Sequence, residues 1–181
     1  MASGSIELVL GPMFAGKTSY LIERARQHKK EQVMAVRPII DTREKGEPML
    51  VSHDKDTFPA VYVPDLHTLV NLHPEQTGHK LIIIDEGQFF TDLKEGCLSL
   101  CKLGLVVIVG ALNGMWNREP WPAISKLLPV VTNLTYLTAS CSICQNKASF
   151  TYRTVKGGED ILIGAEESYC ALCMDCYEKK K

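Results

Sequence analysis

Short runs of valine, isoleucine and leucine alternate with segments of helical periodicity over roughly the first three quarters of the chain. The nearly continuous apolar runs predict strands over residues 6–10, 33–36, 81–84, 105–109 and 134–137. Between them, helices are predicted over residues 17–31, 91–102 and 120–128. Uninterrupted apolar runs are typical of strands buried on both faces. The alternation therefore predicts an α/β fold with a parallel sheet flanked by helices.

Two segments depart from this pattern. Residues 41–64 carry charges, a glycine and three prolines, with weak strand signals at 49–52 and 60–63, and we expect loops and a hairpin there. Beyond residue 140, helical periodicity gives way to cysteines, turn residues and short strand-like pieces at 148–153 and 160–163. We therefore predict two domains, an α/β domain over residues 1–139 and a small domain over residues 140–181.

Composition and charge narrow the classes of function. With 181 residues, 45% hydrophobic content and a formal net charge of −1, the chain has the profile of an ordinary globular protein and not of a nucleic-acid-binding one. The longest apolar stretch, residues 103–112, is too short and too broken by glycine to span a membrane. Seven cysteines without a secretory signal favour a reducing compartment, so we expect a cytoplasmic protein.

A phosphate-binding loop is predicted directly after the first strand. The loop fits the pattern G-x-x-x-x-G-K-[ST] between a strand and a helix, and it consists of Gly11, Pro12, Met13, Phe14, Ala15, Gly16, Lys17 and Thr18. Backbone N–H groups of such a loop point at a polyphosphate, where Lys17 reaches the outer phosphates and the hydroxyl of Thr18 can ligate Mg²⁺. We therefore expect a nucleoside triphosphate to bind here.

Two carboxylates follow the apolar run at residues 81–84. Ligands of open α/β sheets bind at the carboxyl ends of the strands, which is also where the phosphate loop lies. We assign Asp85 to Mg²⁺, by direct or water-mediated contact, because phosphoryl-transfer sites hold the metal with a carboxylate at such a strand end. Glu86 is then the natural general base.

The cysteines of the C-terminal segment have metal-ligand spacing. Two C-x₂-C pairs, Cys141/Cys144 and Cys173/Cys176, are separated by 28 residues, and each pair can present two sulfurs to one zinc ion. Cys170/Cys173 is also a C-x₂-C pair, so the spacing alone leaves the second pair open. A redox dithiol or unrelated free cysteines are the other readings, although the βαβ context of a redox motif is absent. Cys97 and Cys101, four apart on a predicted helix, are expected to be buried core thiols.

These motifs together resemble the type II thymidine kinases. The resemblance rests on Gly-Pro-Met-Phe-Ala-Gly-Lys-Thr at 11–18, Asp-Glu-Gly-Gln-Phe-Phe at 85–90 and the cysteine pairs, with shorter matches at 41–43, 52–54, 111–114, 150–153 and 163–169. It covers the whole chain in order. It implies a phosphate-loop NTPase (RecA-like) domain and a small zinc-binding "lasso" domain that closes over the nucleoside. The implied reaction transfers the γ-phosphoryl group of ATP to the 5′-hydroxyl of thymidine.

The resemblance also implies roles for individual residues. As catalytic residues it gives Glu86, Lys17, Arg43 and Arg153, the two arginines as candidates to neutralise charge on the transferring group. For the nucleotide, it adds to the phosphate loop Asp41, Thr42, Arg43, Asp85, Glu86, Gly87 and Gln88. For thymidine, it implies Met13, Phe89, Leu112, Trp116, Trp121, Thr151, Asp160, Ile161, Leu162, Ile163, Gly164 and Tyr169.

Two positions depart from the family. Trp116 stands where a phenylalanine or tyrosine is usual, which keeps an aromatic wall but narrows the slot for the base, and Asn113 stands where an aspartate is usual. The family spacing from Tyr169 favours Cys173/Cys176 as the second zinc pair, which leaves Cys170 as an extra thiol. A homotetramer and feedback inhibition by dTTP are further implications, with no nucleic-acid or membrane partner.

Two other functions fit parts of the sequence. A nucleic-acid-dependent ATPase could use the cysteine module as a zinc ribbon on a strand, but the acidic residues Glu159, Asp160, Glu166 and Glu167 argue against such contact. A regulatory nucleotide-binding switch without chemistry would leave Glu86 without a purpose.

Overall fold

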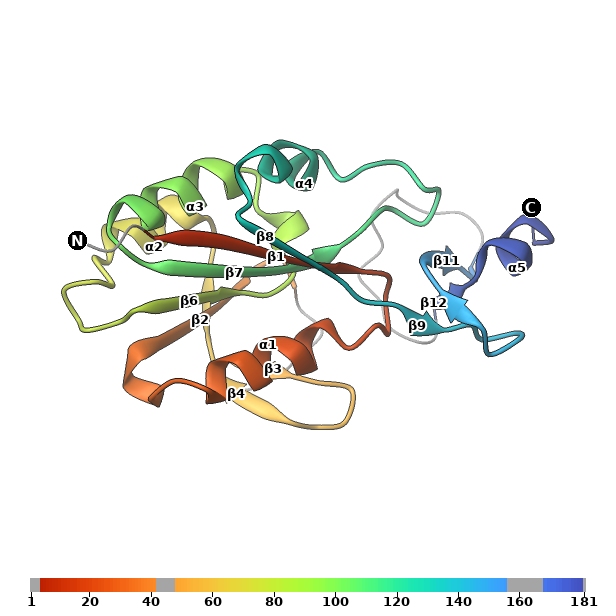
Figure 1. Ribbon diagram of the computed structural model, residues 1–181, viewed down its shortest axis with the longest axis horizontal. Helices are drawn as coiled ribbons and strands as arrows, with labels where there is room; N and C mark the ends of the chain where they lie inside the picture. The colour runs from red at the N-terminus through yellow and green to blue at the C-terminus, as the bar shows by residue number, and fades with distance from the viewer. Residues whose placement is uncertain (1–3, 42–47, 156–167, 181) are drawn as a thin grey trace.

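A parallel six-stranded sheet forms the centre of the molecule (Figure 1). The computed structural model describes residues 4–41, 48–155 and 168–180. Across the sheet the strands follow the order β5 (Val61–Val63), β2 (Val33–Pro38), β6 (Leu81–Ile84), β7 (Val106–Leu112), β1 (Ser5–Gly11) and β8 (Asn133–Tyr136). Every neighbouring pair is parallel. The predicted α/β fold with a parallel sheet is confirmed.

Helices cover both faces of the sheet. One face carries α1 (Lys17–Arg26) together with the hairpin of β3 (Met49–Val51) and β4 (Thr57–Pro59), and the other carries α2 (Leu66–Asn71), α3 (Leu93–Lys102) and α4 (Pro122–Leu127) (Figure 1). Short 3₁₀ turns complete the connections: η1 (Lys30–Gln32), η2 (Gly87–Phe89) and η3 (Leu128–Val130). None of the helices within the described ranges has both the length and the apolar character needed to cross a membrane.

The two faces of the sheet have separate hydrophobic cores. Along β6, Leu81 and Ile83 pack toward α1, whereas Ile82 and Ile84 pack toward α2, α3 and α4. All four are fully buried, which explains why β6 is an uninterrupted apolar run with no polar alternation. Close packing of α1 depends on Gly110 in β7, since a Cβ atom there would lie 2.7 Å from Cδ1 of Leu21.

Three local predictions need correction. The helix predicted over residues 17–31 ends at Arg26, because residues 27–32 contain no apolar side chain to bury against the sheet. Of the two weak strand signals, residues 49–51 form a hairpin with 57–59, whereas 61–63 join the main sheet beside β2. Helix α2 was not predicted. Two carboxylates cap its N-terminus. Oδ1 of Asp65 accepts the N–H of Thr68 at 2.7 Å, and Oδ2 of Asp92 accepts the N–H of His67 at 2.9 Å.

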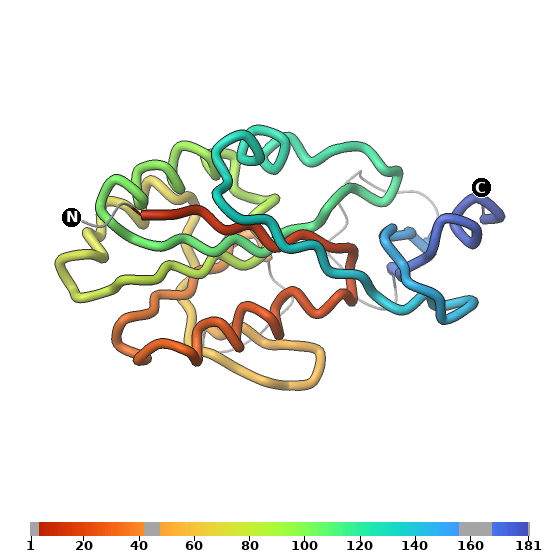
Figure 2. Tube along the Cα trace, in the orientation of Figure 1, coloured from red at the N-terminus to blue at the C-terminus, as the bar shows by residue number. Residues whose placement is uncertain are grey.

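The C-terminal segment forms small antiparallel pairs beyond the carboxyl end of the main sheet. It contains β9 (Ala139–Ser140) paired with β10 (Lys147–Ala148), β11 (Phe150–Arg153) paired with β12 (Tyr169–Leu172), and the helix α5 (Met174–Glu178). The start of β1 and helix α5 lie at opposite ends of the molecule (Figure 2). A third core belongs to this segment and includes Ala148, Leu172 and Tyr177. The strand-like piece predicted at 160–163 lies outside the described residues.

Candidate active site

The predicted phosphate loop connects the end of β1 to the start of α1. Phe14 (φ 65°) and Gly16 (φ 78°) both adopt the left-handed conformation, which glycine tolerates at position 16 without strain. Within the described part of the chain, no side chain caps the N-terminus of α1. The backbone N–H groups of a helix N-terminus can bind an anion, which is the role expected of the predicted phosphate loop. Lys17 is buried there, and its Nζ donates to the carbonyl of Pro12 at 2.8 Å.

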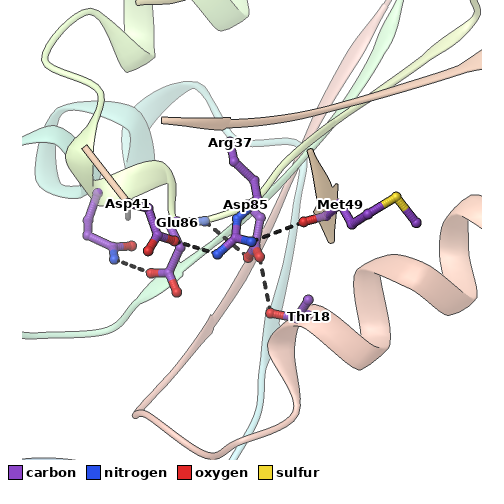
Figure 3. A network of polar contacts seen from close by, with 7 residues as sticks. Thr18, Arg37, Asp41, Met49, Asp85 and Glu86 are labelled. Carbon is purple, nitrogen blue, oxygen red and sulfur yellow. Dashed lines mark hydrogen bonds and ion pairs between the residues drawn. The ribbon is translucent and has the colours of Figure 1, made fainter. Parts of the chain in front are cut away.

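The second predicted element meets this loop through a side-chain contact. The hydroxyl of Thr18 donates to Oδ2 of Asp85 at 3.1 Å, and the other carboxylate oxygen of Asp85 accepts the N–H of Glu86 at 3.0 Å (Figure 3). Asp85 is buried directly at the carboxyl end of β6. A hydroxyl and a carboxylate placed together at this edge are hard oxygen donors of the kind that bind Mg²⁺.

Glu86 is held in one orientation by its neighbours. Its carboxylate Oε2 accepts a 2.6 Å hydrogen bond from Nε2 of Gln88, and Oε1 of Gln88 in turn accepts the N–H of Leu112 at 3.0 Å. Gln88 is buried, so this chain of bonds ties the glutamate to the end of β7. Glu86 itself has φ 53°, a left-handed conformation that costs a non-glycine residue about 1 kcal/mol. Gln88 was predicted to contact the nucleotide, and its hydrogen bond to Glu86 was not predicted.

Asp41, predicted to contact the nucleotide, forms a buried ion pair. Its Oδ2 lies 2.6 Å from a guanidinium nitrogen of Arg37, and a second nitrogen of Arg37 donates to the carbonyl of Met49 at 3.0 Å (Figure 3). Arg37 was missed by the sequence analysis. The sequence pattern that could have indicated this pair is an arginine inside an apolar strand, four residues before an aspartate. Thr42 and Arg43, predicted beside Asp41, lie outside the described residues.

Residues predicted to bind thymidine come together from distant elements. The N–H of Met13 in the phosphate loop donates to Oγ1 of Thr151 in β11 at 3.0 Å, across 138 positions of sequence. The rings of Phe89 and Trp121 meet edge to face, with centroids 5.7 Å apart and an interplanar angle of 74°. Leu112 ends β7 and is half-buried. Residues 160–164, including Asp160, Ile161, Leu162, Ile163 and Gly164, lie outside the described residues.

A second group of predicted residues surrounds β11. The guanidinium of Arg153 lies over the ring of Trp116, 5.8 Å from its centroid. In the antiparallel pair, Arg153 stands opposite Tyr169 of β12, and both side chains are buried. The structure therefore brings Trp116, Arg153 and Tyr169 into one region.

A side-chain contact that was not predicted fastens the C-terminal segment to the sheet. Nδ2 of Asn113 donates to the hydroxyl of Tyr136 and to the carbonyl of Ser149, both at 2.9 Å. The bond to the carbonyl of Ser149 needs an N–H donor, which an amide has and a carboxylate lacks, whereas the hydroxyl of Tyr136 can either donate or accept. Asn113 thus joins the end of β7 to β8 and to the residue that precedes β11.

Four cysteines form one cluster in the C-terminal segment. The sulfur atoms of Cys141, Cys144, Cys173 and Cys176 all lie within 4.8 Å of one another. Cys170, the alternative ligand, stands in β12 opposite Tyr152 and outside the cluster. Burial raises the pKa of the Cys141 thiol, but N–H groups from Cys173, Cys144 and Ile143 outweigh it and lower that pKa to about 6. Sulfur donors in this arrangement suit a tetrahedral metal.

Comparisons with known proteins point to one family along nearly the whole chain. The sequence model of the family described as thymidine kinase matches residues 4–177. The chain is 37% identical over 177 residues to a thymidine kinase of raccoon poxvirus, covering 98% of both chains. It is 38% identical over 180 residues to a thymidine kinase of Yaba monkey tumor virus, covering 98% of this chain and 96% of the viral one. To the human protein named "Thymidine kinase, cytosolic" it is 36% identical over 179 residues, covering 98% of this chain and 74% of the human one.

Proposed function

The chain belongs to the thymidine kinase family, and from this premise we propose how its site carries out phosphoryl transfer. The reaction moves the γ-phosphoryl group of ATP to the 5′-hydroxyl of thymidine and gives dTMP and ADP. One observation carries the proposal: Thr18 of the phosphate loop is bonded to Asp85, and Glu86 follows Asp85 directly. A phosphate-binding element, a metal-binding oxygen pair and a candidate base therefore occupy one edge of the sheet.

We assign the nucleotide to the edge of the sheet where the phosphate loop lies. The strand–loop–helix order of β1, the loop and α1 supports a phosphate-loop NTPase domain of the RecA-like type over residues 1–139. Lys17 neutralises the outer phosphates, and the backbone of residues 11–18 surrounds them. Thr18 and Asp85 would hold Mg²⁺, which when bound neutralises charge on the β- and γ-phosphates.

Glu86 acts as the general base in this proposal. Its carboxylate accepts the proton of the 5′-hydroxyl as the oxygen attacks the γ-phosphorus, and the bond from that phosphorus to the bridging oxygen of ADP breaks. Gln88 keeps the carboxylate in position through its 2.6 Å bond. Lys17, Arg43 and Arg153 are the cations assigned to the transferring group, because charge spreads over its oxygens in the transition state.

The thymidine pocket is assigned to the region between the phosphate loop and the C-terminal segment. Apolar and aromatic side chains would enclose the base, and this group comprises Met13, Phe89, Leu112, Trp116, Trp121 and Thr151. Two contacts support this assignment: the hydrogen bond from Met13 to Thr151 and the edge-to-face packing of Phe89 and Trp121. We assign the sugar to Tyr169 and the base edge to the backbone of residues 160–164.

Structural zinc at the four-cysteine cluster completes the proposed site. The donor set fits Zn²⁺, since four thiolates can surround it and backbone N–H groups stabilise the charge on Cys141. The metal would close the base of the C-terminal domain, residues 140–181, and so restrict the segment that covers the nucleoside. A cytoplasmic homotetramer inhibited by dTTP is the corresponding proposal for its state in the cell.

One assay tests the reaction. Purified protein is incubated with γ-labelled ATP and Mg²⁺ and a panel of nucleosides, and we expect label in thymidine monophosphate. ATP hydrolysis that appears only with single-stranded DNA would instead support the nucleic-acid-dependent ATPase. Nucleotide binding without turnover of any nucleoside would support the regulatory switch.

A further inference from the structure

A compact turn, residues 115–119, connects β7 to α4 and carries Trp116. The turn is closed by its own hydrogen bonds: the N–H of Met115 donates to the carbonyl of Glu119 at 2.9 Å, and the N–H of Arg118 donates to the carbonyl of Met115 at 3.0 Å. Arg118 has φ 69°, a left-handed conformation that is strained for arginine. Contacts from outside the turn must therefore help to keep this conformation.

Helix α5 supplies those contacts. The buried Tyr177 donates its hydroxyl to the carbonyl of Trp116 at 2.5 Å. The guanidinium of Arg118 lies over the ring of Tyr177, 4.8 Å from its centroid, and its NH1 lies 2.6 Å from Oε1 of Glu178. Arg118 is also 5.9 Å from the ring centroid of Phe150 in β11. The turn is thus attached to α5 by a hydrogen bond, a cation–π contact and an ion pair.

The same short helix is part of the cysteine cluster. Cys173 is its N-cap residue and Cys176 lies within it, so Tyr177 and Glu178 directly follow a cluster cysteine. On the other side of the turn, the ring of Trp116 faces the guanidinium of Arg153. A continuous set of contacts therefore runs from the cluster through α5 and the turn to Arg153.

We propose that Tyr177 and Arg118 are positioning residues that hold Trp116 against Arg153, so that the four-cysteine cluster shapes the nucleoside pocket through α5. This inference rests on the proposed function, in which Trp116 lines the pocket and Arg153 faces the transferring group. The hydrogen bond, cation–π contact and ion pair of Tyr177 and Arg118, here called the clamp, do not involve residues 11–18. Ala15 packs against the same hydrophobic core as the ring of Tyr177, and the test variant keeps that ring. The effect should therefore fall on thymidine and spare ATP.

The test variant is Tyr177→Phe, which removes only the hydroxyl and keeps the ring under Arg118. Tyr152→Phe is the matched control: its ring packs edge-on against Tyr177, and its hydroxyl donates to the carbonyl of Lys180 at 3.3 Å, away from the turn. In the metal-loaded protein we measure the KM for thymidine, the KM for ATP, zinc content, and acrylamide quenching of tryptophan fluorescence without substrates. Trp116 is half-buried and Trp121 is buried, so Trp116 dominates the quenchable signal of the two tryptophans.

Tyr177→Phe should raise the KM for thymidine about three- to tenfold, the scale of one lost hydrogen bond, and should increase quenching. The KM for ATP and the zinc content should match those of wild type, as should all four values in Tyr152→Phe. Unchanged quenching and thymidine KM would overturn the proposal, and so would an equal rise in both KM values. A wild-type protein that is inactive on thymidine would refute the proposed function. The quenching measurement needs no turnover, so it would still test whether Tyr177 holds Trp116 in place.

Arg118→Lys separates the ion pair of Arg118 with Glu178 from its stacking on Tyr177. A lysine keeps the charge beside Glu178 but loses the planar stack on Tyr177, so quenching should rise less than in Arg118→Gln. Arg26→Gln is the control, since Arg26 forms an exposed ion pair with Asp56 at 3.1 Å on the far helix α1. Equal quenching in Arg118→Gln and wild type would show that Arg118 does not help to hold Trp116 in place.

Discussion

The hydroxyl of Thr18 lies 3.1 Å from Oδ2 of Asp85, although 67 positions separate the two residues in the sequence. Strand β7 lies between the strands that lead to them, so the contact spans the carboxyl edge of the sheet. It joins the predicted phosphate loop to the acidic strand end. This is the edge to which we assign the metal–nucleotide complex, and its residues are the first to test.

Lys17→Ala and Thr18→Ala should each abolish turnover of thymidine. The first removes the cation placed at the phosphate loop, and the second removes the hydroxyl bonded to Asp85. Initial rates with saturating ATP and thymidine measure the effect. Lys29→Ala, an exposed residue after α1, is the control and should keep the wild-type rate. A near-normal rate in either test variant would show that the phosphate-loop assignment is wrong.

Glu86→Gln should lower kcat by about 10²–10⁴, the usual scale for a lost general base. Glutamine keeps the size of the side chain and a carbonyl that can accept the bond from Gln88, so binding of both substrates should persist. Single-turnover kinetics and equilibrium binding separate the two effects, with the exposed Glu95→Gln as control. Weakened thymidine binding with an unchanged chemical step would assign Glu86 to recognition instead.

One zinc ion per chain should be found, and it should depend on the second cysteine pair of the cluster. Cys176→Ser should lose the metal, whereas Cys170→Ser should keep it and stay active, because only Cys176 belongs to the cluster. Metal content by atomic absorption decides between the two candidate pairs. Removing zinc with a chelator should weaken thymidine binding far more than ATP binding. The opposite result in the two serine variants would identify Cys170 as the ligand.

Asp41→Asn should lower the free energy of unfolding by about 3 kcal/mol, because it removes the carboxylate that lies 2.6 Å from the buried guanidinium of Arg37. Denaturant unfolding of the metal-loaded protein measures this. Asp54→Asn is the control, since the side chain of Asp54 is 85% exposed and the change there should be small. A raised KM for ATP at unchanged stability would instead show that Asp41 contacts the nucleotide directly.

Asn113→Asp, which introduces the residue that the resemblance implies for the family, should destabilise this protein by about 1–2 kcal/mol. A carboxylate cannot donate to the carbonyl of Ser149 and would face it with a like partial charge, although the hydroxyl of Tyr136 can donate to a carboxylate and keep that contact. Asn117→Asp is a close control, because Oδ1 of Asn117 accepts the N–H of Glu119 at 3.0 Å and an aspartate keeps that bond. Equal unfolding midpoints for the two variants would contradict this account.

Much of the fold followed from apolar runs, and the exceptions have local causes. The long runs at β1, β6 and β7 lie in the middle of the sheet, where burial on both faces leaves a strong pattern. Strand β5, of three residues at the sheet edge, is half-exposed and carries little pattern. Helix α2 has six residues, less than two turns, so it depends on caps from Asp65 and Asp92 more than on periodicity.

The candidate site was predictable where chemistry requires a motif. A phosphate loop and paired C-x₂-C turns need particular residues at fixed spacing, so the sequence displays them. Contacts such as those of Arg37 with Met49 and of Gln88 with Leu112 join a side chain to a backbone group. The backbone partner has no residue-specific signature, so only the folded chain reveals such bonds.

The backbone conformation of Glu86 is unfavourable for the stability of the fold. A glycine would adopt its φ of 53° with no steric penalty, and the chain instead keeps a side chain there at a cost of about 1 kcal/mol. Glu86→Gly relieves that conformation but also frees the unfolded chain, so the two effects on stability partly cancel. A mutagenesis screen that scores only thermal stability would therefore not select against Glu86→Gly. With Glu86 as the proposed general base, a screen for a more thermostable protein also needs a selection for thymidine phosphorylation. Without it, Glu86→Gly would remove activity while the melting temperature hardly changes.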